Sequence, residues 1–281
     1  VSTGPHTCAI LDNGDMKCWG YDNYGQLGDG GTNTNTNAPS STAIDLGTGR
    51  TAVAVSAGSL HTCAILDNGD LKCWGRDQYG MVGDCASHTD TNAPSSTAID
   101  LGTGRTAVAV TVGYYHTCAL LDNGDVKCWG YNYQGQLGDG STTDSNAPSS
   151  TAIDLGTGRT AVALSAGYYH TCAILDNGDL KCWGSDHDGQ LGDGASNTNT
   201  NTPSSTAIDL GTGRTAVAVS GGFYHTCAIL DNGDLKCWGR DNEGQLGDGG
   251  TNTNTNAPSS TAIDLGTGRT AVAVSAGYYH T

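Results

Sequence analysis

The sequence predicts an all-β fold, a β-propeller built from five visible repeats of about 55 residues with four strands each. The dipeptide His-Thr recurs at steps of 54 or 55 residues, at His6, His61, His116, His170, His225 and His280. Glycine supplies 43 of the 281 residues, charged residues supply 14%, and Glu243 is the sole glutamate. This composition suits strands joined by turns. No apolar stripe of period 3.6 is present, which argues against a helical solenoid.

Four strand segments follow one another in each repeat, as the second copy illustrates. Residues 61–66 (HTCAIL) lead through an Asp-Asn-Gly turn into residues 70–75 (DLKCWG). A polar loop then ends near Pro94. It is followed by residues 97–102 (TAIDLG), a Gly-Thr-Gly-Arg turn and residues 106–113 (TAVAVTVG). Alternation of alanine and valine in the last segment is typical of a strand with two unlike faces.

We expect residues 1–281 to form a single repeat domain with an extra strand at 270–281. Its units start near His6, His61, His116, His170 and His225. Residues 274–281 repeat the phase of residues 1–7, so five units are followed by an overlapping strand. Either five blades close with that strand as a clasp, or the sequence is a window from a longer array. The longer array is favoured, because a natural C-terminus seldom falls in the middle of a strand without a cap.

The repeat unit resembles the regulator of chromosome condensation (RCC1-like) repeat. Residues 222–249 read GFYHTCAILDNGDLKCWGRDNEGQLGDG, and the His-Thr pair, the turn glycine, the Trp-Gly pair and the Gly-Gln-Leu-Gly run fall where that family has them. The resemblance covers essentially the whole chain and implies a β-propeller, usually of seven blades. It also implies that the recurring histidine is structural. Family members include exchange factors for a small GTPase, β-lactamase inhibitors and bacterial surface proteins. Paired cysteines and Thr/Asn-rich loops depart from the family pattern. The cysteines favour its secreted bacterial-type members, and both departures argue against the role of nuclear exchange factor.

Ten of the eleven cysteines form pairs around the Asp-Asn-Gly turns: Cys8 with Cys18, Cys63 with Cys73, Cys118 with Cys128, Cys172 with Cys182, and Cys227 with Cys237. A three-residue loop with a left-handed glycine would pair Leu66 with Asp70 and set Cys63 opposite Cys73, within disulfide reach. Zinc needs four ligands, whereas each hairpin offers two thiolates, so disulfides are favoured. Five disulfides predict an extracellular or cell-surface location. Cys85 replaces a glycine and is either an intermolecular thiol or a tolerated free thiol.

The net charge of −16 argues against nucleic-acid binding and against docking on anionic lipid. No apolar run approaches the length of a transmembrane segment. No cofactor is expected. Calcium remains an alternative at the acidic Gly-Asp-Gly loops, although their spacing matches no established calcium loop. The weak candidate ligands are Asp29, Asp139, Asp193 and Asp248.

The segment after each Trp-Gly varies among otherwise similar copies and is the predicted binding site. Its candidate residues are Tyr21, Tyr24, Arg76, Tyr79, Tyr131, Tyr133, His187, Arg240 and Glu243. Tyrosine and arginine are frequent hot-spot residues, so these loops suit a variable recognition face on a fixed scaffold. Drift in unconstrained loops is the competing interpretation. The recurring tryptophans are expected to pack between blades.

No catalytic set unique to one repeat is present, so we expect no enzyme. The sequence favours an extracellular scaffold that binds or adheres to a protein or glycan. A structural subunit of a self-assembling filament or surface coat is the first alternative. An enzyme-inhibitor propeller is the second.

Overall fold

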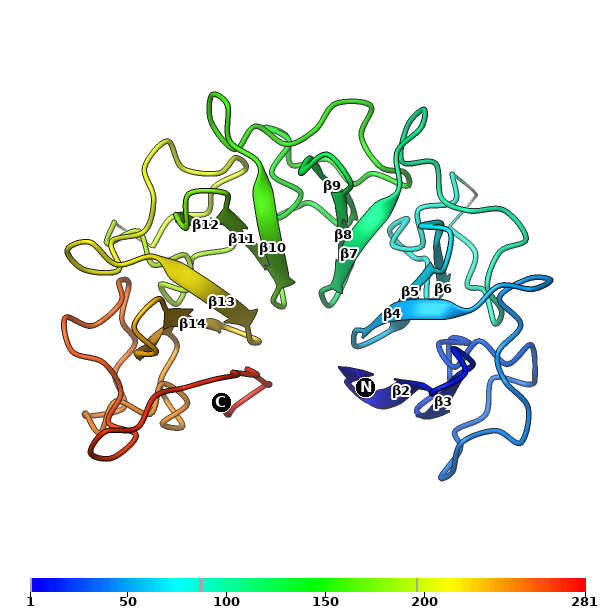
Figure 1. The fold of residues 1–281 in the computed structure, drawn as a ribbon, viewed down its shortest axis with the longest axis horizontal. Coiled ribbons are helices and arrows are strands. Elements are labelled where there is room, and N and C mark those ends of the chain that lie inside the picture. Colours follow the sequence, from blue (N-terminus) through cyan, green and yellow to red (C-terminus); the bar gives the residue numbers. More distant parts are fainter. Residues whose placement is uncertain (1, 86–87, 196) are drawn as a thin grey trace. The chain divides into compact units, whose positions relative to one another are not determined.

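The structure is a computed structural model that describes residues 2–85, 88–195 and 197–281. Its strands form antiparallel sheets of three, and the described residues contain no helix, so the all-β prediction is confirmed (Figure 1). The chain divides into two compact units. Unit 1 holds residues 1–132 and 143–152, and unit 2 holds residues 133–142 and 153–281.

Unit 1 contains three sheets. They are β1 (Ser2–Thr3), β2 (His6–Ile10) and β3 (Met16–Gly20), then β4 (Ala52–Ala57), β5 (His61–Leu66) and β6 (Leu71–Gly75), then β7 (Ala107–Val112), β8 (His116–Leu121) and β9 (Val126–Gly130). Unit 2 contains two sheets. They are β10 (Ala161–Ala166), β11 (His170–Leu175) and β12 (Leu180–Gly184), then β13 (Ala216–Gly221), β14 (His225–Leu230) and β15 (Leu235–Gly239).

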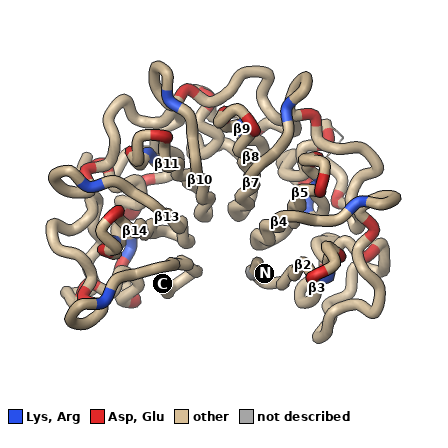
Figure 2. The backbone as a smooth tube through the Cα atoms, viewed as in Figure 1, with Lys and Arg blue, Asp and Glu red and all other residues tan. Residues whose placement is uncertain are grey.

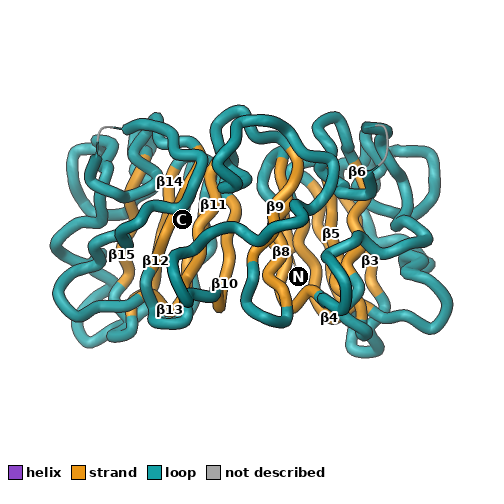
Figure 3. Tube along the Cα trace, turned by 90° about the horizontal axis from the view of Figure 1, so that it is seen from above, coloured by secondary structure: helices purple, strands orange, loops and turns teal. Residues whose placement is uncertain are grey.

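Each sheet takes its first strand from the end of the preceding sequence repeat. The β4 strand precedes the second His-Thr pair in the chain, yet it pairs with β5, with Ala57 opposite Thr62. A short connection makes this pairing local, whereas a long polar loop follows β6. A bulge at Val53 shifts the register between Ala52 and Ala54 and leaves the valine side chain 62% exposed. A structural blade therefore straddles the sequence repeat, and its strands run between loops at their two ends (Figure 3).

Two expected strands are absent from these sheets. Residues 97–102 donate one backbone hydrogen bond to the outer strand, from Ile99 N to Leu71 O (2.9 Å), and are not a strand. Residues 270–281, all of them described, also contain no strand. In other repeats the matching segment pairs with the strand that begins at the next His-Thr, of which only His280 and Thr281 belong to this sequence.

The hairpin turns have the geometry that the cysteine spacing predicts. Leu66 N donates to Asp70 O (2.9 Å), and Gly69 has a φ of 82°, which favours glycine. Cys63 therefore faces Cys73 directly. Disulfides join the five predicted pairs, with Cα atoms 4.0–4.1 Å apart.

Replacing both Cys118 and Cys128 with serine should lower the free energy of unfolding by about 2–3 kcal/mol, because the unfolded hairpin gains freedom. Both cysteines are buried, whereas the free Cys85 is exposed. Cys85→Ser is therefore the matched control and should leave stability unchanged. Urea unfolding under non-reducing conditions measures both variants, and equal stability of the double variant and the control would contradict the structural role of the disulfide.

A buried tryptophan joins neighbouring sheets within each unit through a hydrogen bond and close packing. Trp74 Nε1 donates to Gln26 O (3.1 Å) of the preceding repeat, and Thr62 Oγ1 donates to the same carbonyl (2.8 Å). A Cβ on Gly28 would lie 2.3 Å from Trp74 Nε1, so only glycine fits beneath the indole. The pattern repeats with Trp129, Trp183 and Trp238, each fully buried. The Gly-Gln-Leu-Gly run of one repeat therefore forms the packing site for the tryptophan of the next repeat.

The recurring histidine adds a hydrogen bond between neighbouring repeats. His61 Nε2 lies 2.7 Å from Thr117 Oγ1 in the next repeat, and that hydroxyl donates to Met81 O (2.9 Å). Since a threonine hydroxyl has one proton, the imidazole Nε2–H must be the donor. Burial lowers the pKa of His61 to about 3. The histidine is therefore structural, as the family resemblance implies.

Candidate functional site

The variable segments form one set of loops, the variable loops, at residues 21–24, 76–79, 131–134, 185–188 and 240–243. The first residue of a variable loop donates its N–H to the residue just before the recurring histidine. Arg76 N bonds Leu60 O (3.0 Å), and Tyr131 N bonds Tyr115 O (2.9 Å). Each variable loop consequently lies beside the connection between the first two strands of its own sheet.

The second residue of each variable loop is buried and holds the loop in shape. Asp77 Oδ1 accepts a hydrogen bond from Val82 N (2.9 Å), and Asp77 N donates to Asp90 Oδ1 (2.9 Å). Desolvation raises the pKa of Asp77 to about 6, against the opposing effect of the hydrogen bond from Val82. The other copies at this position are Asp22, Asn132, Asp186 and Asp241, all buried. The repeated Asp or Asn was the sequence signal for this structural role.

In unit 1 the variable loops bring together an aromatic cluster around one arginine. The Arg76 guanidinium lies 4.6 Å from the ring centroid of Tyr24 and 5.8 Å from that of Tyr115. Tyr79 lies 5.3 Å from Tyr115 and 4.8 Å from Tyr131. We call Tyr24, Arg76, Tyr79, Tyr115 and Tyr131 the tyrosine–arginine cluster. All five side chains are partly exposed, and they come from three successive repeats.

Tyr21 joins the edge of this cluster, 6.1 Å from Tyr24. The five unit 1 residues predicted from the sequence therefore lie together. Tyr114 and Tyr115 belong to the same surface, 4.3 Å apart, but were not predicted. Their sequence signal was the pair of residues before each histidine, which changes from Ser59-Leu60 in the second repeat to aromatic pairs in the later ones.

In unit 2 the aromatic pairs form a ladder. Phe223 lies 3.6 Å from both Tyr168 and Tyr278, with interplanar angles of 33° and 37°. Arg240 lies 5.5 Å from the Tyr224 centroid and 5.7 Å from the Tyr279 centroid. Arg240 also pairs with Glu243 (3.3 Å), so two predicted residues meet here. Tyr133 and His187 are exposed residues of the other variable loops of this unit.

The acidic Gly-Asp-Gly loops are shaped by their own hydrogen bonds. Asp29 Oδ1 accepts from Gly31 N (2.8 Å), and Asp139, Asp193 and Asp248 make the matching contact two residues on. Among the residues that the structure describes, no group of three or more His, Cys, Asp or Glu side chains is placed to hold a metal ion. The structure thus gives these carboxylates a role in the turn.

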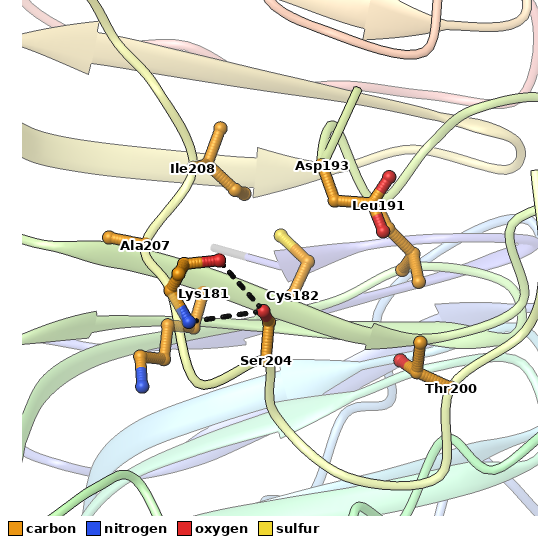
Figure 4. A pocket seen from close by; sticks show the side chains of 9 residues that line it. Lys181, Cys182, Leu191, Asp193, Thr200, Ser204, Ala207 and Ile208 are labelled. Atoms are coloured by element: carbon orange, nitrogen blue, oxygen red, sulfur yellow. Dashed lines mark hydrogen bonds between the residues drawn. The ribbon is translucent and has the colours of Figure 1, made fainter. Parts of the chain in front are cut away.

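Unit 2 also contains a small pocket next to a disulfide. It is lined by Lys181, Cys182, Leu191, Asp193 and Ser204, among others (Figure 4). The Ser204 hydroxyl accepts a hydrogen bond from Thr206 N (3.2 Å) and contacts the Thr206 hydroxyl. The cavity of about 30 Å³ has room for one or two waters. Cys182 is in a disulfide, so the pocket offers no thiolate.

Lysine, arginine, aspartate and glutamate positions occur in every repeat (Figure 2). Arg50 pairs with Asp67 (3.2 Å) and Arg105 with Asp122 (3.3 Å), in turns at the strand ends opposite the variable loops. These pairs are solvent-exposed and contribute little stability. No helix long and apolar enough to cross a membrane occurs in the described part of the chain.

A model of the RCC1-like domain matches residues 1–281. The chain belongs to the RCC1-like domain family. Two solved structures share the fold of this chain. Human WBSCR16 superposes with a TM-score of 0.83 at 20% identity, covering 98% of this chain and 68% of that one. Yeast RCC1 (Prp20), in its crystal structure with Kap60, gives a TM-score of 0.80 at 20% identity, covering 98% and 64%. The β-propeller class is therefore confirmed for this RCC1-like chain.

Two curated relatives of this RCC1-like chain come from a plant and a mammal. The ultraviolet-B receptor UVR8 of Arabidopsis thaliana is 31% identical over 244 residues, 87% of this chain and 53% of the receptor. The E3 ubiquitin-protein ligase HERC2 of Mus musculus is 29% identical over 253 residues, 90% of this chain and 5% of the ligase. The chain spans about half of UVR8. These relatives support the RCC1-like family and give no support to its secreted bacterial-type members. RCC1-like propeller domains typically serve as protein-interaction scaffolds.

Proposed function

We propose that this chain is a non-enzymatic protein-binding module of an oxidising, extracellular or cell-surface environment, and that its variable loops contact the partner. One observation supports this proposal most strongly. The tyrosine–arginine cluster gathers partly exposed side chains from three successive repeats onto one surface. Tyr and Arg supply large contact area and hydrogen bonding, as interface hot spots require.

The structure around the tyrosine–arginine cluster favours partner binding, rather than drift in unconstrained loops, as the reason why the variable loops differ in sequence. The buried Asp77 makes hydrogen bonds to Val82 and Asp90, which favours a single arrangement of the partly exposed Arg76 and Tyr79. A preorganised surface loses little side-chain entropy on binding. A protein partner is favoured over a glycan, because the rings of Tyr79, Tyr115 and Tyr131 pack edge-on or tilted against each other and present no single flat stacking platform.

The location rests on the disulfides. Each of five hairpins carries a disulfide, and disulfides are rare in proteins of the reducing cytosol. The strongly acidic surface, with a net charge of −16, suits a soluble module that avoids nucleic acid and anionic lipid.

Alanine at both Tyr24 and Tyr79 should weaken partner binding by at least about a hundredfold, because two hot-spot rings of the cluster are removed. Immobilised chain is used to capture a partner from the extracellular fraction of the source organism, and the purified pair is then measured by calorimetry. Arg105→Ala, at the opposite strand ends, is the control and should bind like the unaltered chain. Equal affinity of the double variant and the control would refute the proposed surface.

A second function, as a subunit of an extracellular filament or coat, is favoured by Cys85. This thiol is exposed, free and set in a loop whose other copies carry glycine. Electron microscopy of non-reduced material separates the two functions. Discrete particles support the binding module, whereas filaments that disappear in Cys85→Ser support the structural subunit.

A further inference from the structure

Arg76 differs from most arginines of this chain because it has no carboxylate partner. Arg240 pairs with Glu243 (3.3 Å). Four arginines of the turns each pair with an aspartate at 3.2 or 3.3 Å: Arg50, Arg105, Arg159 and Arg214. Arg269 belongs to the last copy of that turn, and this sequence contains no counterpart of its aspartate. Arg76 forms no ion pair with any residue that the structure describes, although the chain has 28 acidic side chains.

The groups that surround Arg76 hold its side chain without neutralising it. Arg76 is partly exposed, and its guanidinium lies over the Tyr24 ring, 4.6 Å from the centroid. Its Nη2 donates to Gln78 Oε1, and Gln78 Nε2 donates in turn to the Tyr79 hydroxyl (3.2 Å). An amide oxygen carries no net charge, and a guanidinium has five N–H donors. Arg76 therefore keeps an uncompensated positive charge and has N–H groups left for a further acceptor.

The fifth repeat contains the same arginine together with a carboxylate. Arg240, like Arg76, is the first residue of its variable loop. Each guanidinium lies over the tyrosine that precedes the histidine of the next repeat, at 5.7 Å from Tyr279 for Arg240 and 5.8 Å from Tyr115 for Arg76. Arg240 is paired with the residue three positions further on, Glu243, whereas the second repeat has a tyrosine at that position. An arginine in this setting thus binds a carboxylate in one repeat and lacks one in the other.

The variable loops around Arg76 present no exposed carboxylate of their own. Asp22 and Asp77, the acidic residues of the first two loops, are each 1% exposed. The third variable loop contains no acidic residue. Asp90 accepts a hydrogen bond from Asp77 N (2.9 Å) and forms no ion pair with Arg76. Arg76 is therefore the only charged member of the tyrosine–arginine cluster, which makes this surface locally positive in a chain of net charge −16.

We propose that Arg76 binds an acidic side chain, aspartate or glutamate, of the partner protein. The carboxylate of the partner takes the place beside Arg76 that Glu243 takes beside Arg240. Charge complementarity is the argument for an acidic guest, since the cluster presents one unpaired cation, and a guanidinium matches a carboxylate with two parallel N–H groups. The inference rests on the proposed protein-binding function and names the chemistry that the tyrosine–arginine cluster recognises.

The test uses N-acetyl-glutamate methylamide as the probe and its neutral isostere, N-acetyl-glutamine methylamide, as the matched ligand. The Nε–H resonance of Arg76 in the full chain is followed by NMR at neutral pH during each titration. The glutamate probe should bind with about two- to fivefold higher affinity than the glutamine probe, the range expected of an exposed ion pair. Equal affinities of the two probes would overturn the proposal, because the charge would then have no role.

Two substitutions of one residue localise the effect. Tyr79→Glu places a carboxylate three residues after Arg76, as in the pair of Arg240 with Glu243, and should remove the preference for the glutamate probe. Tyr79→Gln loses the same ring without adding a charge, so this variant should still prefer the glutamate probe. Glu243 and Gln134 occupy the equivalent position in other repeats, so the fold tolerates both side chains. The same preference in both variants would exclude Arg76 as the site.

The captured partner separates this inference from the proposed function. Arg76→Gln should weaken partner binding, whereas Arg105→Gln, which removes an arginine at the opposite strand ends, should not. If alanine at Tyr24 and Tyr79 weakens binding but Arg76→Gln binds like Arg105→Gln, the binding module stands and the carboxylate contact is wrong. If the glutamate probe is preferred at Arg76 but the partner ignores Tyr24 and Tyr79, the proposed contact surface fails although Arg76 recognises a carboxylate.

Discussion

Replacing Trp129 with alanine should lower the free energy of unfolding by about 3–5 kcal/mol. The indole is fully buried in a cluster with Val82 and Leu101 of the preceding repeat. Its Nε1 also satisfies Met81 O (3.0 Å), so the variant loses both packing and a buried hydrogen bond.

Trp19→Ala is the matched control for this variant. Trp19 occupies the equivalent position in the first repeat but is partly exposed, so its loss should cost less than half as much. Urea unfolding followed by circular dichroism measures both. Equal destabilisation by the two substitutions would show that the contacts of Trp129 with the preceding repeat contribute little to the free energy of unfolding.

Acidification from pH 7.5 to pH 5 should lower the free energy of unfolding by about 4–6 kcal/mol. Burial lowers the pKa of four of the recurring histidines, to about 3 for His61 and His116 and to about 4 for His6 and His225. The unfolded chain then binds protons that the folded chain does not, and stability is lost as pH falls below 6.5. The buried carboxyls of Asp77 and Asp186 act in the opposite direction, because their pKa values are raised to about 6. The histidines are more numerous and more strongly shifted, so they determine the sign.

His61→Gln tests whether these histidines cause the pH dependence. The variant removes one titrating group, so the difference in stability between pH 7.5 and pH 5 should shrink by about 2 kcal/mol. Urea midpoints at the two pH values measure this difference for both proteins. An unchanged difference in the variant would assign the acid sensitivity to other groups.

Local features of the fold were predictable because each is encoded within a few residues. The Asp-Asn-Gly turn fixes the register that places Cys63 opposite Cys73, and neighbouring residues alone determine that turn. The absence of the predicted fourth strand could not be foreseen in this way. Residues 97–102 alternate like a strand, yet only Ile99 bonds the outer strand through its N–H, because pairing depends on an edge formed elsewhere in the chain.

The candidate surface was partly predictable for a related reason. Variation after each Trp-Gly pointed to Tyr24, Arg76 and Tyr79, since those positions change while the framework does not. Tyr115 was not predicted because it lies nearly forty residues further along the chain from Arg76, and only the folded sheets bring the ring within 5.8 Å of the guanidinium. The position of Tyr115 beside Arg76 depends on contacts between repeats, which the sequence of a single repeat does not reveal.

Hydrogen–deuterium exchange of the chain with and without its captured partner tests the central claim most directly, namely that the variable loops are the contact surface. Binding should protect residues 21–27, 76–82 and 131–136 and the aromatic pair at 114–115. Protection confined to the turns at 47–51 and 102–106, where the exposed Arg–Asp pairs lie, would place the partner at the other strand ends and contradict the account.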